Sequence, residues 1–291
     1  MQFKSLINRW TPGKRSGEAI PVLEIRPFRG WAGPNLRELW RYREVLYVFM
    51  WRDIKVRYKQ TVIGAAWVVI QPLLTMLIFS IFFGLLLGVP SQGFPYPIFA
   101  FTALLPWQFF VKALTEASTS LVMNERVVSK VYFPRLLVPL AVVLAGLLDF
   151  AIGFVILLGL MLFFGISLSW TALAVPAFLL LAVLTASGVS FWLSALDVKY
   201  RDVRYTLVFL AQVWLFATPV IYPASIVPEA WRALYGLNPM VGVVEGFRWS
   251  LLGSVTPDIP MLIVSTVVIV VVFVGGVIYF NQTERTMADV I

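Results

Sequence analysis

The sequence contains no cysteine and no histidine. Without cysteine the chain has no disulfide framework and no thiolate chemistry. Without histidine it lacks the usual general base and the commonest metal ligand. Charged residues are also scarce, at 13% of 291 residues, and the acids among them are scattered. We therefore expect no catalytic residue, no metal site and no cofactor bound by this chain.

A further absence concerns nucleotide binding. The pattern G-x-x-x-x-G-K-[ST] does not occur, so the chain has no P-loop to hold the phosphates of ATP. Gly13-Lys14-Arg15-Ser16 resembles only the end of that pattern and lacks its leading glycine. If ATP powers this protein, the nucleotide and its Mg²⁺ bind to another chain.

Apolar residues are abundant instead. They make up 60% of the chain, and the mean hydropathy is +0.86, which is typical of a polytopic membrane protein. The first 59 residues hold 13 basic and 5 acidic residues, whereas the remainder holds ten of each. This bias fixes the N-terminal side in the cytosol by the positive-inside rule. The N-terminus lacks the apolar core of a cleavable signal peptide, so we expect it to be retained.

The apolar runs predict an all-α membrane protein with six transmembrane helices. No charged residue occurs from Thr61 to Val111, a length that fits two spans of about 20 residues and a turn. The six spans are placed near residues 63–87, 97–122, 136–164, 172–196, 205–221 and 259–280. Because their number is even, both termini lie in the cytosol.

The remaining segments complete the predicted domain organisation. Residues 35–60 form a basic amphipathic helix that lies in the membrane interface against anionic headgroups, or alternatively a solvated helix packed on a partner. The full division is a cytosolic polar extension at 1–34, the interface helix at 35–60, a six-span domain at 61–281 with a charged loop at 124–135, and a cytosolic tail at 282–291.

The connection at residues 222–257 predicts two short helices rather than a loop. Pro228 suits the first turn of one helix, which ends at Gly236. Asn238-Pro239 caps and opens the next helix, which ends at Gly253. Neither is long enough to cross a bilayer, so we expect both to be half inserted on the outer side before the last span.

Several short motifs follow one another in these topological places. They are Arg57-Tyr58 before Thr61-Val62-Ile63-Gly64, then Lys130-Val131-Tyr132-Phe133-Pro134-Arg135, Tyr200-Arg201-Asp202, Thr218-Pro219-Val220-Ile221-Tyr222-Pro223 and Asn238-Pro239-Met240. In this order they resemble the membrane subunits of ABC-2 type exporters of bacterial polysaccharides. The likeness is greatest to O-antigen permeases of lipopolysaccharide export, with capsule and teichoic-acid permeases as near relatives. It extends from about Arg52 to Phe280.

The resemblance implies a function and a set of partners. It implies a subunit of an ATP-driven exporter that moves lipid-linked polysaccharide from the cytosol to the periplasm across the bacterial inner membrane. It also implies a homodimer, two cytosolic ATPase subunits that hold the ATP and Mg²⁺, contact with membrane lipids, and no nucleic acid. A coupling helix between the second and third spans, and two gate helices before the sixth, belong to the same pattern.

The 124–135 loop is the predicted point of ATPase coupling. A short helix can be capped by Asn124 or Ser129, and Pro134 would end it before the third span. The charges and polar groups offered to an ATPase are those of Asn124, Glu125, Arg126, Lys130 and Arg135. The alternative is an ordinary solvated turn. A second charged loop, residues 197–204, is a weaker contact candidate.

Three charged residues are predicted inside the membrane. Lys112 and Glu116 are spaced i, i+4 on the second span and can pair. An aspartate at the bilayer centre costs about 2.5–3.5 kcal/mol, so Asp149 should face the bundle interior or a dimer seam. It is either a structural contact between spans or part of an ion pathway.

The substrate path is predicted from aromatic and basic residues. Aromatic faces stack on sugar rings, which favours Trp107, Phe109 and Tyr222 near the outer side, although interfacial belts facing lipid explain such residues as well. Basic groups at the cytosolic entrance are suited to a lipid pyrophosphate, namely Arg52, Lys55 and Arg57. Attraction to anionic lipids is the alternative for these three residues.

The outer region carries a further pair of charges. Glu245 and Arg248 are spaced i, i+3 and are predicted to form a latch in a gate. At an exposed surface such a pair contributes about 0–1 kcal/mol. The alternative is that residues 222–253 form a structural plug at the outer rim.

The sequence leaves two alternatives to the polysaccharide exporter and disfavours two other classes of membrane protein. One is an ABC-2 permease for capsule polysaccharide, teichoic acid or another amphiphile, and another is a stand-alone channel. An integral membrane transferase requires clustered carboxylates or a histidine at the membrane face, which this sequence does not provide. The sparse charge inside the membrane favours an external power source over a self-powered carrier.

Overall fold

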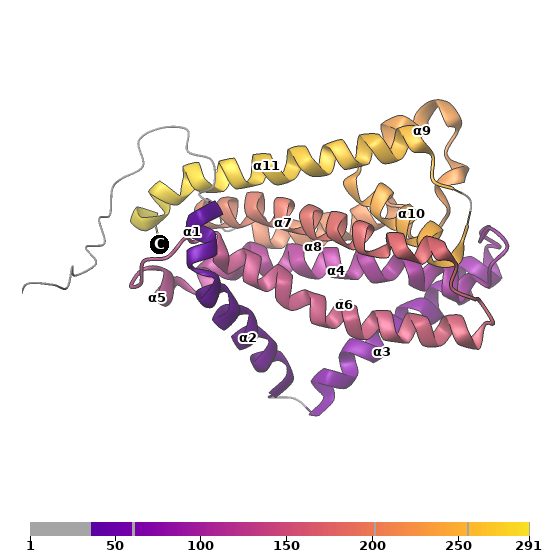
Figure 1. The fold of residues 1–291 in the computed structure, drawn as a ribbon, viewed down its shortest axis with the longest axis horizontal. Helices are drawn as coiled ribbons and strands as arrows, with labels where there is room; N and C mark the ends of the chain where they lie inside the picture. Colours follow the sequence, from indigo (N-terminus) through magenta and orange to yellow (C-terminus); the bar gives the residue numbers. More distant parts are fainter. Residues whose placement is uncertain (1–35, 60–61, 201, 255, 291) are drawn as a thin grey trace, which may run out of the picture. The chain divides into compact units, whose positions relative to one another are not determined.

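The fold consists of helices, as the sequence predicts (Figure 1). The computed structural model describes residues 36–59, 62–200, 202–254 and 256–290, and every regular element among them is helical. The predicted polar extension at residues 1–34 lies outside the described residues. The all-α fold class is therefore confirmed.

The helices follow one another with short connections. Their bounds are α1 (Leu36–Arg41), α2 (Arg43–Lys59), α3 (Val62–Phe79), the π-helix η2 (Ser80–Leu86), α4 (Tyr96–Met123), α5 (Glu125–Val128), α6 (Leu137–Phe163), η3 (Trp170–Ala174), α7 (Val175–Lys199), α8 (Val203–Phe216), η4 (Ala224–Ile226), α9 (Glu229–Tyr235), α10 (Pro239–Leu252) and α11 (Ile259–Val290).

Five of the six predicted spans are helices long and apolar enough to cross a membrane. Within the described ranges they are Ala66–Leu86, Tyr96–Met123, Leu137–Phe163, Trp170–Lys199 and Ile259–Glu284. The remaining predicted span, the fifth along the chain at residues 205–221, contains the 14-residue helix α8. At 1.5 Å per residue α8 is about 21 Å long, short of the roughly 30 Å hydrocarbon layer. The chain continues from α8 through non-helical residues 217–223.

The last helix is longer than predicted. The apolar pattern predicts that the last span ends at Phe280 and that residues 282–291 form a separate tail. In the structure α11 continues without interruption to Val290. Residues 281–290 contain neither proline nor glycine, so no helix-breaking residue ends α11 at the edge of its apolar run.

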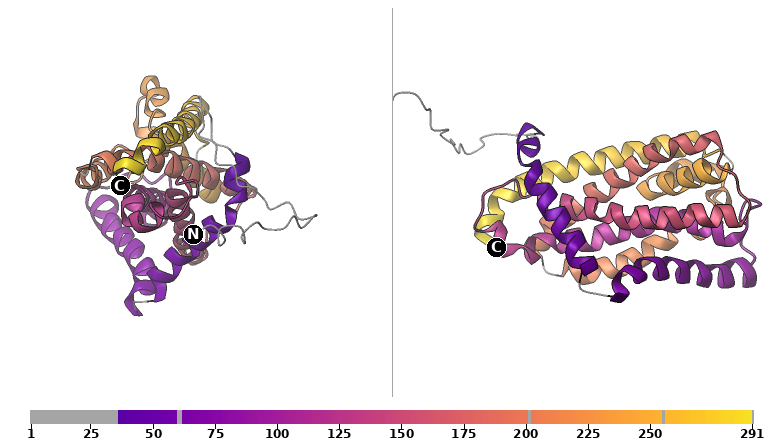
Figure 2. Two further views of the ribbon diagram at one scale, coloured as in Figure 1. Left: turned by 90° about the vertical axis from the view of Figure 1, so that its left-hand side faces the viewer. Right: turned by 60° about the horizontal axis from the view of Figure 1, so that its bottom comes forward.

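The core is centred on α4. This helix contacts α3, α6, α7, α8 and α10, and most of its length is buried, whereas the crossing stretch of α3 buries no residue. Figure 2 shows α3 running along the outside of the bundle. Phe110 of α4 lies between Trp107 and Trp214, with ring centroids 5.7 and 5.1 Å away. The centre of the bundle is thus closely packed with aromatic rings.

The bundle has two distinct ends. At one end lie α5, the beginning of α2 and the C-terminal end of α11, and we call this the loop end (Figure 1). At the opposite end, which we call the far end, lie α9 and the turn before α4. The long helices join the two ends directly.

The predicted interface helix is divided into two. A break at Tyr42 separates α1 from α2, where a single helix was expected over residues 35–60. Leu46 and Met50 pack against the bundle, whereas Trp40 and Tyr47 are exposed. Apolar residues therefore occupy two faces of this segment, one against the protein and one open.

The two short helices before the last span are present where the sequence predicts them. Pro228 immediately precedes α9, which ends before Gly236. Asn238 caps α10, because its Oδ1 accepts a hydrogen bond from the Met240 N–H at 3.1 Å. Gly253 ends α10 in the left-handed conformation with φ of 63°, which glycine adopts without strain.

Candidate functional site

The 124–135 loop is anchored to the bundle rather than freely solvated. Val128 and Phe133 are buried in an apolar cluster that also includes Phe49 of α2 and Phe280 of α11. The rings of Phe49 and Phe133 are 5.4 Å apart. The loop therefore moves only with the helices that hold its apolar side chains.

Polar contacts hold both ends of the loop. At its start Arg52 Nη1 donates to Asn124 Oδ1 at 2.7 Å, and Asn124 Nδ2 donates to the Ser120 carbonyl at 2.7 Å. At its end the Arg135 N–H donates to Glu284 Oε1 at 2.9 Å, and Arg135 Nη1 donates to the Glu284 carbonyl at 3.1 Å. Two of the five predicted coupling residues, Asn124 and Arg135, are thus engaged within the chain.

The outward face of the loop carries the other three predicted residues. Glu125, Arg126 and Lys130 are exposed. Large apolar side chains are exposed beside them, namely Met123, Val127, Val131 and Tyr132. Exposed apolar side chains interspersed with charges of both signs are suited to a protein contact more than to a solvated turn.

Tyr132 marks the edge of this face. Its hydroxyl donates to Glu38 Oε1 at 3.5 Å, a long contact to the first turn of α1. Partial burial raises the pKa of Tyr132, and the nearby Glu38 and Glu284 carboxylates raise it further. The Tyr132 hydroxyl therefore stays protonated at physiological pH, and its oxygen can accept a hydrogen bond from a partner.

The second charged loop is largely tied to itself. The Asp197 side chain is fully buried, and Arg204 Nε donates to its two carboxylate oxygens at 2.8 and 3.1 Å. Among the described residues of this loop, Lys199, Tyr200 and Asp202 are exposed. Two of these carry a charge, compared with three exposed charged residues in the 124–135 loop.

The charged residues predicted inside the membrane meet in one cluster. Arg57 of α2 contacts Asp149 at 2.6 Å and Glu116 at 2.5 Å. Lys112 contacts Asp149 at 2.6 Å, and the Tyr58 hydroxyl also donates to Asp149. The predicted Lys112–Glu116 pair is present but long, at 4.0 Å. Two cations thus face two carboxylates, so the cluster carries no net formal charge.

A cavity of about 730 Å³ opens beside this cluster, between α3, α4 and α6. Three predicted substrate-path residues line it: Trp107, Phe109 and Arg57. Trp67, Gln71 and Gln108 add aromatic and amide groups to its wall. Gly146 and Gly153 of α6 also line it, and their missing side chains admit Phe109 and Leu105, which would lie 3.4 and 2.5 Å from an added Cβ.

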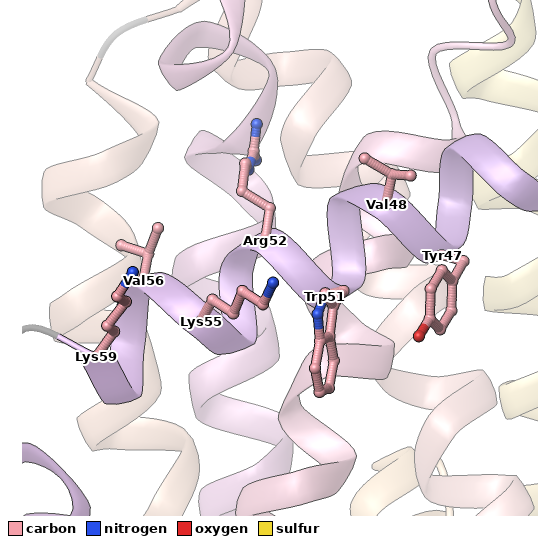
Figure 3. A pocket seen from close by; sticks show the side chains of 7 residues that line it. All are labelled: Tyr47, Val48, Trp51, Arg52, Lys55, Val56 and Lys59. Carbon is pink, nitrogen blue, oxygen red and sulfur yellow. The ribbon is translucent and has the colours of Figure 1, made fainter.

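The two other basic residues of the predicted path, Arg52 and Lys55, lie on a different surface. They line a pocket of about 420 Å³ on α2, together with Tyr47 and Trp51 (Figure 3). The Tyr47 and Trp51 rings are stacked, and Lys55 Nζ lies 5.5 Å from the Trp51 ring. Arg52 points away from these rings toward Asn124. The structure therefore does not bring Arg52, Lys55 and Arg57 together in one site.

The last predicted path residue, Tyr222, lies at the far end. Its hydroxyl donates to the Phe216 carbonyl at 2.8 Å and is 3.1 Å from the Tyr235 hydroxyl. Burial and the hydrogen bond with the Tyr222 hydroxyl raise the pKa of Tyr235. Tyr222 thus connects the end of α8 with α9.

The predicted latch, Glu245 and Arg248, is buried inside the protein and is not an exposed surface pair. Arg248 Nη1 lies 2.8 Å from Glu245 Oε1, and the Arg248 side chain is fully buried. Its guanidinium lies 3.7 Å from the centre of the Phe99 ring. The surface estimate of about 0–1 kcal/mol is therefore wrong for this pair, because buried partners cannot separate without stranding a charge.

Arg248 also satisfies backbone groups of the non-helical segment after α8. Its Nη2 donates to the Val220 carbonyl at 2.7 Å, and its Nη1 donates to the Tyr222 carbonyl at 3.1 Å. Tyr96 of α4 donates to the Ile221 carbonyl at 2.9 Å. Backbone that is neither helix nor sheet requires such partners at membrane depth.

Sequence reasoning missed several residues that determine these sites. Glu284 was assigned to a tail, and Val128 and Phe133 were treated as part of a polar connection. The alternation of apolar Val128 and Phe133 with charged neighbours was an available signal of a half-buried loop. Glu284 could be found only by extending the last helix beyond its apolar run.

Comparisons with known proteins agree in family. A profile of the ABC-2 type transporter family matches residues 44–252. The O-antigen export system permease protein RfbA of Myxococcus xanthus is 28% identical over 254 residues, covering 86% of this chain and 96% of the relative. RfbA of Klebsiella pneumoniae is 27% identical over 252 residues, covering 85% and 95%. The polysialic acid transport protein KpsM of Escherichia coli is 20% identical over 253 residues, covering 82% and 93%.

Proposed function

Because this chain belongs to the ABC-2 type transporter family, we propose that it is the membrane subunit of an ATP-driven exporter of lipid-linked polysaccharide of the O-antigen type. The names of the RfbA relatives, which align over most of both chains, support this substrate class. The main support for this mechanism is that the 124–135 loop is packed against the bundle on its inner face and exposed on its outer face. Such a loop can receive force from a partner and pass it to the bundle.

The lengths of the helices support a protruding docking end. At 1.5 Å per residue, α4 is about 42 Å long, α6 about 40 Å and α11 about 48 Å. The hydrocarbon layer is roughly 30 Å thick, so about 10–18 Å of these helices extends beyond it. We assign this excess to the loop end and place that end in the cytosol, within reach of a soluble ATPase.

The proposed ATPase contact includes three of the five coupling residues predicted from the sequence. Glu125, Arg126 and Lys130 are exposed and can pair with a partner, and Met123 and Tyr132 supply apolar area beside them. Asn124 and Arg135 instead support the loop from within. The proposed assembly contains two copies of this chain and two ATPase subunits, which bind the ATP and Mg²⁺, in the bacterial inner membrane with both termini cytosolic.

The substrate path is proposed to use the 730 Å³ cavity, where Trp107 and Phe109 provide aromatic surface. Arg57 contributes little free charge to a pyrophosphate, because Asp149 and Glu116 already neutralise it. Lys55, exposed beside Trp51, is the better candidate for an anionic headgroup. Any gate movement at the far end would carry α10 together with residues 220–224, since Glu245 and Arg248 hold them as one block.

Charge reversal on the loop tests the coupling assignment. In the Glu125→Arg, Arg126→Glu double variant, both charges meet like charges on the ATPase, so we expect its co-purification to fall at least tenfold while the permease still inserts. Polysaccharide export should fall in parallel. The matched control is Arg43→Glu, Glu44→Arg on α2, which reverses an adjacent exposed pair outside the loop but at the same end of the bundle. Normal ATPase binding and export by the loop variant would refute the assignment.

The KpsM relative supports a second candidate substrate, a capsule polysaccharide, and teichoic acid or another amphiphile remains within the same transporter class. Deleting the chain and identifying which surface polymer accumulates in the cytosol separates these substrates. A stand-alone channel is separated by transport measured in vesicles that contain the permease alone. Transport there without nucleotide would overturn the exporter proposal.

A further inference from the structure

Helix α11 makes polar contacts both with Arg135, at the end of the 124–135 loop, and with α10 at the far end. It runs without a break from Ile259 to Val290. At 1.5 Å per residue, Glu284 lies about 38 Å along the helix from Ile259. Anything that displaces one end of α11 along its axis displaces the other, because a continuous helix does not shorten.

The attachment at the loop end is made by Glu284. Its carboxylate accepts the Arg135 N–H at 2.9 Å, and its carbonyl accepts Arg135 Nη1 at 3.1 Å. Arg135 lies just before α6, which begins at Leu137 without a side-chain cap of its own. Glu284 therefore satisfies an unpaired N–H near the start of α6, where negative charge is also favoured by the helix dipole.

The attachment at the far end is made by Ser265. Its hydroxyl donates to the Pro239 carbonyl at 2.9 Å and accepts the Gly242 N–H at 3.2 Å, both in the first turn of α10. The contact is tight, since a Cβ on Gly242 would lie 2.5 Å from the Ser265 hydroxyl. A Cβ on Gly236, at the end of α9, would likewise lie 2.6 Å from the Met261 carbonyl.

The middle of α11 is stiffened by α7. Backbones touch where Gly276 of α11 faces Gly188 of α7, because a Cβ on Gly276 would lie 2.5 Å from the Gly188 carbonyl. Trp192 of α7 stacks on Tyr279 with ring centroids 4.6 Å apart, and its Nε1 donates to the Val272 carbonyl at 3.2 Å. The two helices therefore form a paired strut rather than a single flexible rod.

We propose that α11 is the strut that carries movement of the 124–135 loop to the helices α9 and α10, with Glu284 and Ser265 as the positioning residues that fasten its two ends. This inference rests on the proposed function, because it takes the loop as the place where the ATPase acts. It adds the route between that loop and the opposite end of the membrane domain. Glu284 touches neither nucleotide nor polysaccharide in this role.

The experiment compares export per ATP hydrolysed in vesicles that contain the full exporter. Glu284→Ala removes the carboxylate from the Arg135 N–H and leaves the helix backbone intact. We expect ATP hydrolysis within twofold of wild type and export reduced about tenfold. Glu284→Gln keeps an accepting oxygen and should restore most export, and the exposed Gln282→Ala is the matched control that changes neither rate.

Ser265→Ala tests the other end with a nearly isosteric change. It should lower export per ATP about fivefold, whereas Thr266→Ala, which loses only a bond to its own helix, should not. The proposal is overturned if Glu284→Ala and Ser265→Ala export normally for each ATP hydrolysed. It is also overturned if Glu284→Ala loses ATPase binding and export in equal proportion, since Glu284 would then only shape the loop.

A distance measurement provides a readout that a purely structural role would not change. The chain has no cysteine, so Glu229→Cys, an exposed position on α9, accepts one spin label in each subunit. With an ATPase whose own cysteines are replaced, we expect ATP to shift the distance between the two labels in wild type and not in Glu284→Ala. An unaltered shift in Glu284→Ala would contradict the strut. The proposed function is tested separately from the strut. If the 124–135 loop does not bind the ATPase, the Glu125→Arg, Arg126→Glu variant should bind it normally.

Discussion

Lys112 with Glu116 on α4 and Glu245 with Arg248 on α10 are both pairs of opposite charge spaced about one helical turn apart. In the first pair the nitrogen and oxygen are 4.0 Å apart, and Lys112 lies closer to Asp149, at 2.6 Å. In the second the distance is 2.8 Å, and both side chains are buried. Equivalent spacing in the sequence thus leads to a loose local pair in one place and a close buried pair in the other.

The surroundings explain the difference. The α4 pair faces a cavity and the end of α2, where Arg57 and Asp149 compete for its charges. The α10 pair faces a non-helical segment whose carbonyls require donors, and Arg248 supplies them. Removing one partner of a partly exposed charge that has several partners costs little stability. Removing the counter-ion of a buried charge costs much more.

The largest expected effect follows from removing Arg248. Arg248→Ala leaves the Glu245 carboxylate unpaired in a buried place and two carbonyls unsatisfied, which should destabilise the protein by about 3–5 kcal/mol. Thermal unfolding in detergent, together with the yield of monodisperse protein, measures this. The expected result is little or no folded protein.

The matched control for that variant is Arg232→Ala. Arg232 has the same i, i+3 spacing to an acid, but Glu229 is 88% exposed and the pair is 3.7 Å apart. An exposed pair contributes about 0–1 kcal/mol, and the hydrogen bond from Arg232 Nε to the Val227 carbonyl adds about 1 kcal/mol, so this variant should lose much less stability than Arg248→Ala. Equal unfolding temperatures for the two variants would remove the distinction between the pairs.

An intermediate effect is expected at Asp149, the shared partner in the α4 cluster. Asp149→Asn leaves Arg57 and Lys112 with one carboxylate, Glu116, and should cost about 1.5–3 kcal/mol, the range for hydrogen bonds to charged groups. Glu116→Gln should cost less, because the Glu116 side chain is 40% exposed and that of Asp149 only 12%. Chemical unfolding of the two purified variants ranks them, and a larger loss for Glu116→Gln would reverse this account.

Much of the fold follows from local sequence. The apolar runs predict the long helices, and Pro228, Asn238 and Gly253 predict the two short helices, because caps and breakers act within one turn. The length of α8 was overestimated, since the apolar residues after Phe216 are buried without being helical. The spacing of apolar residues cannot distinguish a helix from a buried non-helical segment whose backbone carbonyls accept hydrogen bonds from a buried side chain such as Arg248.

The candidate site was less predictable. The loop and its exposed charges could be identified from Glu125, Arg126 and Lys130, but the engagement of Asn124 and Arg135 could not. Their partners, Arg52 and Glu284, lie 72 and 149 residues away in sequence. Contacts at such separations depend on how the helices pack, and one sequence contains no direct signal of them.

The smallest expected effect is the coupling between Lys112 and Glu116 themselves. A double-mutant cycle with Lys112→Met and Glu116→Gln isolates it, provided that Asp149 and Arg57 are retained in every variant. At 4.0 Å and with side chains 33% and 40% exposed, the coupling should be about 0.5 kcal/mol or less. The parallel cycle with Glu245→Gln and Arg248→Met should give several times that value, if the single variants fold well enough to be unfolded reversibly. Neither burial nor distance favours the Lys112–Glu116 pair. A coupling above about 1 kcal/mol between these two residues would therefore show that helical spacing, and not burial, determines the strength of such pairs.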